Sequence, residues 1–312
     1  MSISKSSKIY IAGHNGMVGS ACIRELKRKG YHNLTFSGSQ ELDLRVQKKV
    51  EDFISAEKPD IIIDAAAIVG GIWANNEYPY KFLMDNMLIQ NNLIKSAVDN
   101  NVKKFIFLGS SCIYPKLAPQ PLKEEYLLSS YLETSNQWYA IAKISGVKLI
   151  QAIRKEFGYD YVSLMPTNLY GPNDNYDFKT SHVLPAMIRK FHEAKFNQRE
   201  SATLWGSGTP LREFLHVDDL ASAILFSLEN NLEENMYNVG SGEELTIKKL
   251  ANLIKKEVGY NGKIVWDEAK PNGTPRKFLD SSKLNDLGWK SKIKLTDGIS
   301  KTYENFLSLK LN

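Results

Sequence analysis

The sequence predicts an α/β protein with a doubly wound parallel sheet, and two observations support this class. Short apolar runs alternate with longer amphipathic runs through the first half of the chain, and a glycine-rich turn joins the first pair. Strands that alternate with helices usually form a parallel sheet covered on both faces. After Pro172 the alternation loosens, which predicts a smaller α/β part towards the C-terminus.

The expected elements can be placed along the chain by their apolar periodicity. Strands are expected at 8–12, 33–36, 60–65, 105–109 and 161–165, and helices at 20–29, 46–57, 78–100 and 135–157. A further apolar helix is expected after Asp218 and Asp219, which could cap it. We divide the chain into a dinucleotide-binding domain at 1–171 and a mainly substrate-binding domain at 172–312, with about 213–240 returning to the sheet.

Composition favours an ordinary globular protein. The 312 residues are 43% hydrophobic and 24% charged, and the net charge is +5. Lysines are spread along the chain, so no nucleic-acid partner is expected; a basic pocket for a small anion and a solvated surface both remain open. Cys22 and Cys112 are the two cysteines, and no metal site is expected. The N-terminus lacks a signal-peptide pattern and no run suggests a membrane span, so we expect a cytoplasmic location.

The spacing Gly13-x-x-Gly16-x-x-Gly19 lies between the first strand and the first helix. Glycines there permit a tight turn and let a pyrophosphate approach the helix N-terminus, although a turn that only packs is the alternative. The sequence therefore predicts a Rossmann-type cofactor site. At the end of the second strand, residues 36–40 offer neither the acid that binds a ribose diol nor an arginine. Asp43 either approaches the adenine or caps its own loop.

Tyr139 and Lys143 are four residues apart in an expected helix, which places a phenol and an ammonium on one face. Such a pair can move a proton to or from a carbonyl oxygen, and the cation is expected to lower the phenol pKa. A packed ring beside a solvated lysine is the common alternative. Ser110 follows the strand at 105–109, where its hydroxyl could bind a carbonyl oxygen or cap the next turn.

Together, the glycine turn, Ser110 and the Tyr139–Lys143 pair resemble the extended short-chain dehydrogenase/reductase superfamily. Longer strings are similar to the GDP-L-fucose synthase family over nearly the whole chain. These strings are Val69-Gly-Gly-Ile-Trp-Ala-Asn-Asn76, Gly109-Ser-Ser-Cys-Ile-Tyr-Pro-Lys116, Met165-Pro-Thr-Asn-Leu-Tyr-Gly-Pro172, Ser181-His-Val183, Trp205-Gly-Ser-Gly-Thr-Pro-x-Arg-Glu-Phe-Leu-His-Val-Asp-Asp219 and Gly273-Thr-Pro-Arg-Lys277.

The resemblance implies NADPH-dependent reduction of a GDP-4-keto-6-deoxy sugar, preceded by epimerisation at carbons 3 and 5. It implies that Cys112 is the base and His182 the acid of the epimerisation, although without it Cys112 suggests a buried apolar residue and His182 a loop residue. Substrate-binding residues would be Asn168, Lys190, Trp205, Arg212 and Lys277. Cofactor-binding residues would be Gly13, Asn15, Gly16, Met17, Val18, Gly19, Ser39, Asp43, Leu44, Tyr139, Lys143 and His182.

The chain departs from the family pattern at three of these positions. Lys190 stands where the family usually has arginine, so a bidentate fork is replaced by a point charge. Asn15 and Ser39 stand where well-known members carry arginines that bind the 2′-phosphate of NADP. NADPH is still expected, held more weakly, and NADH is not excluded.

Three other functions remain open. A reductase without epimerase activity could act on a related GDP-keto heptose, because an added carbon changes binding by only ~1–3 kcal/mol in an apolar pocket. A sugar-nucleotide 4-epimerase with bound NAD shares the glycine turn and the Tyr139–Lys143 pair, and a non-enzymatic nucleotide sensor would not need Tyr139. The resemblance also implies a homodimer formed through the helices at 78–100 and 135–157.

Overall fold

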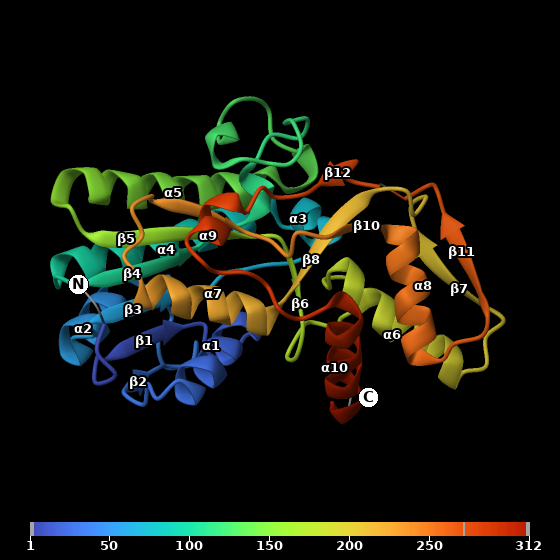
Figure 1. The fold of residues 1–312 in the computed structure, drawn as a ribbon, viewed down its shortest axis with the longest axis horizontal. Coiled ribbons are helices and arrows are strands. Elements are labelled where there is room, and N and C mark those ends of the chain that lie inside the picture. The colour runs from blue at the N-terminus through green and yellow to red at the C-terminus, as the bar shows by residue number, and fades with distance from the viewer. Residues whose placement is uncertain (1–2, 271, 310–312) are drawn as a thin grey trace.

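The computed structural model describes residues 3–270 and 272–309. Its main feature is a six-stranded parallel sheet in the order β2-β1-β3-β4-β5-β9, with helices on both faces (Figure 1). The expected fold class is confirmed. The strands of this sheet are β1 (Ile9–Ala12), β2 (Leu34–Thr35), β3 (Ile61–Asp64), β4 (Lys104–Leu108), β5 (Asp160–Pro166) and β9 (Met236–Val239).

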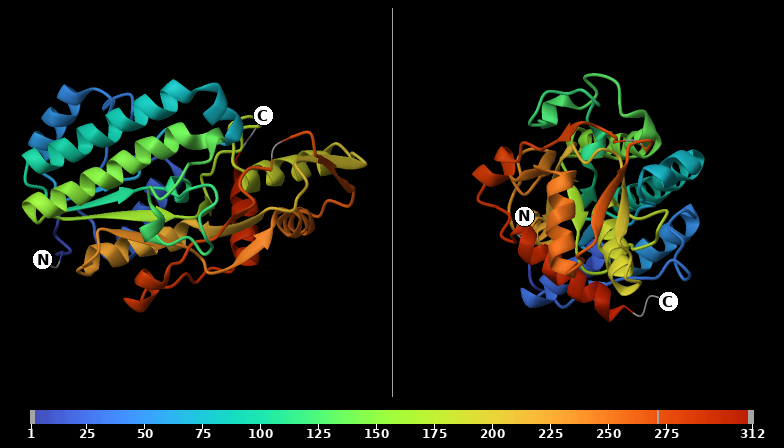
Figure 2. Two further views of the ribbon diagram at one scale, coloured as in Figure 1. Left: turned by 90° about the horizontal axis from the view of Figure 1, so that it is seen from above. Right: turned by 90° about the vertical axis from the view of Figure 1, so that its right-hand side faces the viewer.

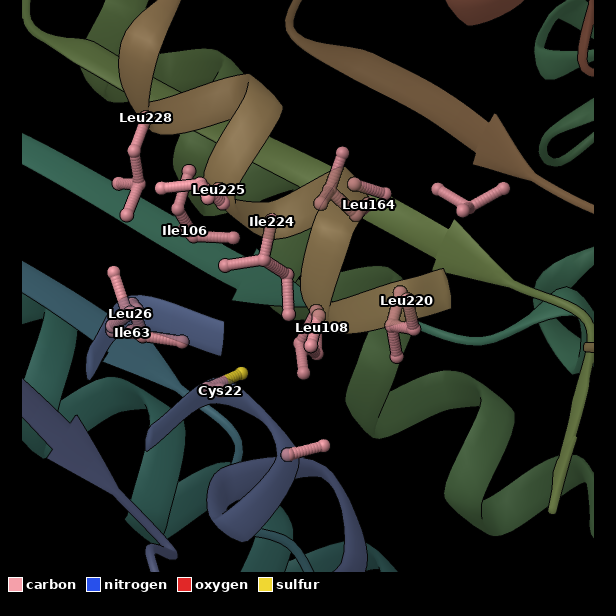
Figure 3. Packing of buried hydrophobic residues seen from close by; sticks show 14 of the residues in the cluster. Cys22, Leu26, Ile63, Ile106, Leu108, Leu164, Leu220, Ile224, Leu225 and Leu228 are labelled. Carbon is pink, nitrogen blue, oxygen red and sulfur yellow. The ribbon is translucent and has the colours of Figure 1, made fainter. Parts of the chain in front are cut away.

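Two apolar layers hold the helices on the sheet, because alternate residues of each strand face opposite sides. Ile9 and Ile11 of β1 belong to the layer beneath α1 (Met17–Arg28) and α7 (Val217–Glu229). Figure 3 shows Leu220, Ile224, Leu225 and Leu228 of α7 in the same apolar cluster as Cys22 and Leu26 of α1.

The opposite layer contains Tyr10 and Ala12 of the same strand. It lies beneath α2 (Gln47–Glu57), α4 (Pro79–Asp99) and α5 (Gln137–Phe157). The helices α4 and α5 lie side by side along the sheet (Figure 2). The carboxyl ends of the strands therefore project from a sheet that helices cover on both faces.

Among the described residues, the smaller part is built from short strands and three helices. In one sheet, β8 (Leu211–His216) pairs with β6 (Asn168–Tyr170), β10 (Glu244–Thr246) and β12 (Arg276–Lys277), and in another β7 (Ser201–Trp205) pairs with β11 (Lys263–Asp267). Its helices are α6 (Val183–Phe196), α8 (Ile247–Val258) and α10 (Leu295–Ser308), whereas α9 (Ser282–Asp286) packs on β9 of the large sheet (Figure 1). The strand β9 leaves this part to join the large sheet, and the boundary at residue 172 stays a prediction.

The expected bounds of the elements agree closely with the structure, with three exceptions. Helix α1 begins at Met17, three residues before the expected start, because Gly16 already serves as its N-cap. A short helix, α3 (Ile72–Glu77), was not expected. The expected caps of α7 were wrong: His216 is the N-cap, and its Nδ1 accepts a hydrogen bond from the N–H of Asp218, which lies in the first turn. Among the described residues, no helix is long and apolar enough to span a bilayer.

Candidate active site

The glycine turn after β1 is built for close backbone contact. Gly13 has a φ of +77°, and a Cβ there would lie 2.7 Å from the carbonyl oxygen of Ala65. A Cβ on Gly19 would lie 2.3 Å from the carbonyl oxygen of Gly13. Larger residues at these two positions would therefore push the turn away from β3 or from α1.

This turn fits the pyrophosphate of a dinucleotide. Gly16 caps α1 without a side-chain hydrogen bond, so the first N–H groups of that helix remain available to an anion. Met17 and Val18 form the first turn of α1, and both are half-buried against the core. These predicted cofactor residues therefore lie together at the carboxyl edge of the sheet, where nucleotides bind in such folds.

The adenosine end of this site has few groups for a phosphate. Asn15 and Ser39 are both exposed, and Phe36 stacks on the ring of His14 at 4.7 Å between centroids. Asp43 accepts hydrogen bonds from the backbone N–H and the guanidinium of Arg45, as the loop-capping alternative requires.

Two further residues here are also engaged with the protein itself. Arg45 donates to Asp85 as well as to Asp43, so its charge is already paired on two sides. Leu44 packs against the core beneath α4, and its carbonyl accepts a hydrogen bond from Asn92. The assignment of Asn15, Ser39, Asp43 and Leu44 to cofactor binding stays a prediction.

Tyr139 and Lys143 lie in the first two turns of α5, above the end of β4. The Lys143 ammonium is buried, donates a hydrogen bond to the Leu108 carbonyl at 2.9 Å and lies 5.8 Å from the centroid of the Tyr139 ring. Ser110 follows β4 and is half-buried; its Oγ accepts a hydrogen bond from the N–H of Cys112 at 3.3 Å. Ser110 thus caps the short 3-10 helix Ser111–Ile113, and its hydroxyl can donate either to the Cys112 thiol or to a substrate oxygen.

The expectation that Lys143 lowers the pKa of Tyr139 is wrong for this structure. Burial raises the pKa of Tyr139 well above its ordinary value, and the nearby Cys112 and Asp64 raise it further. Burial also lowers the pKa of Lys143. Tyr139 therefore holds its proton at neutral pH, which suits a group that gives a proton to a developing alkoxide.

Cys112 lies on the 3-10 helix that follows β4, with only 7% of its surface exposed. Burial raises the pKa of its thiol, while the positive charges of Lys277 and Lys143 and a hydrogen bond with Ser110 oppose that rise. The raised pKa favours the protonated thiol. The positive charges of Lys277 and Lys143 would stabilise the thiolate when it forms.

His182 is the N-cap residue of α6, and its side chain is exposed beside Lys277. The surrounding protein and the charge of Lys277 lower the pKa of His182. The loop before it is fixed by Gly71, whose N–H donates to the Thr180 carbonyl at 3.0 Å. A Cβ on Gly71 would lie 2.8 Å from the Ser181 carbonyl oxygen, so the expected motif around α3 supports His182 by direct backbone contact.

Lys277 and Arg212, two of the predicted substrate-binding residues, lie next to each other near Cys112 and His182. On β12, Lys277 pairs in register with Arg212 of β8, and its charge acts on both Cys112 and His182. Burial lowers the pKa of Arg212 to about 10, while Glu133 opposes this change. A hollow beside Cys112 is lined by Lys277, Glu133 and Asn136. The charge of Lys277 therefore acts on the Cys112 thiol from the smaller part of the molecule.

Lys190 and Trp205 form a second group further out. The Lys190 ammonium donates to the Thr203 carbonyl at 3.1 Å and lies 5.7 Å from the centroid of the Trp205 ring. Lys190 lines a hollow between α6 and β7, and Trp205 is 46% exposed. The amide of Asn168 donates to the Glu213 carbonyl at 2.7 Å, which fixes it beside β8. These residues border the site but are not in contact with Tyr139 among the described interactions.

Sequence reasoning missed two acidic residues of the site. Glu133 pairs with Lys116 at 2.9 Å and stands next to Arg212 and Lys277. Asp64 is fully buried at the end of β3, near Lys143. The signal for Asp64 was available, because an acid ends an otherwise apolar strand at the edge where ligands bind.

The fold and the site thus define a nucleotide-dependent enzyme with a tyrosine–lysine pair. A family model described as the NAD dependent epimerase/dehydratase family matches residues 9–240. The chain is 56% identical to GDP-L-fucose synthase 1 of Arabidopsis thaliana over 97% of this chain and 94% of the relative, and 50% identical to GDP-L-fucose synthase of Escherichia coli over 96% of each.

A solved structure is also similar over nearly its whole length. It is MlghC, the GDP-mannoheptose C4 reductase from Campylobacter jejuni with NADP bound, with a TM-score of 0.89, 37% identity and coverage of 98% of this chain and 99% of that one. The chain belongs to the NAD dependent epimerase/dehydratase family, among relatives that are named GDP-L-fucose synthase.

Proposed function

We propose that this protein reduces the 4-keto group of a GDP-4-keto-6-deoxy sugar after epimerising it at carbons 3 and 5. The observation that carries this proposal is that four groups able to transfer protons or stabilise charge gather near the end of β4. Tyr139 and Lys143 lie on α5 close to Cys112, and the charge of Lys277 acts on both Cys112 and His182. The names of the relatives support the substrate class.

In the reduction, Tyr139 and Ser110 donate hydrogen bonds to the 4-keto oxygen. The reduced nicotinamide supplies the hydride when it is bound. The raised pKa keeps the phenol of Tyr139 protonated beforehand, and the phenol gives its proton to the oxygen as hydride transfer makes that oxygen a strongly basic alkoxide. Lys143, held by the Leu108 carbonyl, stabilises the resulting phenolate and can bind the cofactor ribose.

In the epimerisation, the Cys112 thiolate removes the proton from the carbon next to the ketone. The charge spreads onto the 4-keto oxygen, where Ser110 and Tyr139 stabilise it. His182 then returns a proton to the opposite face of that carbon. The charge of Lys277 favours the thiolate of Cys112 and disfavours the imidazolium of His182, so it promotes both proton transfers.

The GDP part of the substrate is assigned to the cationic side of the site. Arg212 and Lys277 can oppose the diphosphate, and Lys190 provides a further charge beside the exposed Trp205 ring. Asn168 borders the sugar end, held by its bond to Glu213.

We propose NADPH as the hydride donor, with NADH accepted less well. The NADP bound to the Campylobacter jejuni relative supports this choice, while the lack of an arginine at Asn15 and Ser39 weakens it. Turnover with the two cofactors at equal concentration tests this assignment, and a clear advantage for NADH would overturn it.

A reductase without epimerase activity is the second candidate. The similarity to a GDP-mannoheptose C4 reductase favours it, because the two chains align over nearly their full length. It would use Tyr139, Lys143 and Ser110 in the same way and leave Cys112 and His182 without a proton-transfer role.

Incubation of GDP-4-keto-6-deoxymannose with NADPH in deuterium oxide distinguishes the two candidates. We expect deuterium at carbons 3 and 5 of the reduced product, detected by NMR. A reduced product without deuterium at these carbons would remove the epimerase part, and a parallel reaction with the corresponding heptose reports the preferred sugar.

We further propose that the protein is a homodimer formed through α4 and α5. The outer face of these helices exposes large apolar side chains: Tyr80 (73%), Met84 (38%), Leu88 (37%), Trp138 (38%) and Ile141 (40%). An apolar face on two adjacent helices suits a second copy of the same face. Light scattering at micromolar concentration should give the mass of a dimer, and a monomer mass would contradict the proposal.

We propose a cytoplasmic location because both cysteines are free thiols. Cys22 and Cys112 are both free, and the reactive role proposed for Cys112 requires a reduced thiol. Reducing compartments preserve such thiols. Fractionation of cells that express the chain tests this, and recovery in an oxidising compartment would contradict it.

A further inference from the structure

The chemistry proposed above leaves unused a buried charge close to the Tyr139–Lys143 pair. Asp64 ends β3 after three isoleucines, and none of its surface is exposed. Its Oδ1 accepts a hydrogen bond from the Ala66 N–H at 3.2 Å, but its Oδ2 has no hydrogen-bond partner among the described residues. A buried carboxylate with a free oxygen is costly to the fold, so its presence needs an explanation.

The register of the sheet shows which layer Asp64 occupies. Asp64 pairs with Phe107 of β4, and partners in register face the same side of a sheet. Phe107 lies against α5, since a Cβ on Gly146 would come within 2.3 Å of its ring. The Lys143 ammonium lies 4.8 Å from the centroid of the same ring. Asp64 and Lys143 therefore share the narrow layer between the sheet and α5.

The charges in this layer act on one another. Burial raises the pKa of Asp64 to about 6, and Lys143 opposes this rise, so the carboxylate is mostly ionised at neutral pH. Asp64 in turn opposes the fall in the pKa of Lys143 that burial causes. The other titratable groups facing the pair are Tyr10 from β1, Tyr139 from α5 and Cys112.

The two groups do not form a direct ion pair in the part of the chain that the structure describes. The Lys143 ammonium instead donates to the Leu108 carbonyl, and its other N–H groups remain free. A fixed negative charge nearby can therefore keep the ammonium protonated without occupying the donors that the reaction needs.

We propose that Asp64 is a positioning residue of the reduction, the counter-charge that keeps Lys143 protonated beneath Tyr139. This inference rests on the proposed function for its role in turnover. Its electrostatic part, the effect of Asp64 on the charge of Lys143, can be measured by cofactor binding alone.

The test compares Asp64→Asn and Asp64→Leu with the wild-type protein. We expect the dissociation constant for NADPH, measured by fluorescence, to increase at high pH as Lys143 loses its proton. In both variants this alkaline limb should move down by about one pH unit, the usual effect of losing one nearby opposite charge. The maximal turnover rate should fall about tenfold at neutral pH with little change in KM for the sugar.

Asp60→Asn is the matched control, because Asp60 precedes the opposite end of the same strand and pairs with Lys103. This variant should leave the alkaline limb unchanged. The Leu variant continues the apolar run of β3, so it tests the proposal if the Asn variant does not fold.

An unmoved limb in a folded Asp64 variant would overturn the proposal, and unfolding of both variants would assign Asp64 a structural role instead. A wild-type protein that binds NADPH but reduces no GDP-keto sugar would remove the proposed function, while a shifted limb would still support the link between Asp64 and Lys143.

Discussion

The two pairs that we propose to transfer protons are built in different ways. Tyr139 and Lys143 lie on adjacent turns of α5, so their separation is fixed by one helix. Cys112 and His182 come from the end of β4 and the start of α6, and the cation that acts on both, Lys277, lies on β12. The first pair is therefore insensitive to how the smaller part packs, whereas the second depends on it.

The largest expected effect isolates the pair on α5. Tyr139→Phe should lower the reduction rate about 10³-fold, because it removes the proton donor without changing the packing against Phe82. Exchange of deuterium at carbons 3 and 5 should continue, since Ser110 still binds the keto oxygen. Stopped-flow oxidation of NADPH and NMR of the sugar measure the two steps separately, and equal loss of both would show that the pairs do not act independently.

A substitution of Cys112 tests the second pair separately from the first. Cys112→Ala should lower deuterium exchange about 10²-fold and leave hydride transfer from NADPH largely intact. Cys22→Ala is the matched control, because Cys22 is a buried thiol between α1 and α7, away from the site. If exchange survives in the Cys112 variant, another base must serve the epimerisation.

A smaller effect is expected for the residues of the smaller part that we propose to bind the nucleotide. Lys190→Ala should raise KM for the GDP-sugar about tenfold with little change in kcat, because it removes a charge that does not contact the reacting carbons. Lys270 lies 5.6 Å from the centroid of the Trp205 ring but outside the residues lining the hollow that contains Lys190. Lys270→Ala should therefore change KM less than Lys190→Ala does. A larger change for Lys270→Ala would indicate that the nucleotide binds on the Lys270 side of Trp205.

The smallest effect concerns pH. The pKa of Cys112 is raised and that of His182 is lowered, so the thiolate and the imidazolium coexist in only a small fraction of molecules. The exchange rate should rise with pH up to the His182 pKa, remain level, and fall above the Cys112 pKa. This profile is expected because the reaction needs Cys112 deprotonated and His182 protonated at the same time. Lys277→Met removes a charge that lowers both pKa values, so both limbs of the profile should move to higher pH. An unchanged profile would contradict the role of Lys277.

The sequence predicts features that depend on local periodicity better than features that depend on packing between distant segments. The order and type of the elements of the large sheet were predictable because each has a regular apolar period. The Tyr139–Lys143 pair was predictable for a similar reason, since helix geometry relates residues four apart. The direction of the Tyr139 pKa shift was not, because it depends on burial and on Asp64, which only the packed structure brings near.

The short segment that carries Lys277 has a consequence for divided or shortened chains. It runs back across the loop after β4: the Leu122 N–H donates to the Phe278 carbonyl, and the Asp280 N–H donates to the Leu122 carbonyl. A chain that ended before this segment would keep the glycine turn, Ser110, Cys112, Tyr139, Lys143 and His182. It would nevertheless lose Lys277, the cation whose charge acts on both Cys112 and His182, so the presence of every upstream motif in a gene fragment is not evidence that the fragment encodes a working epimerase.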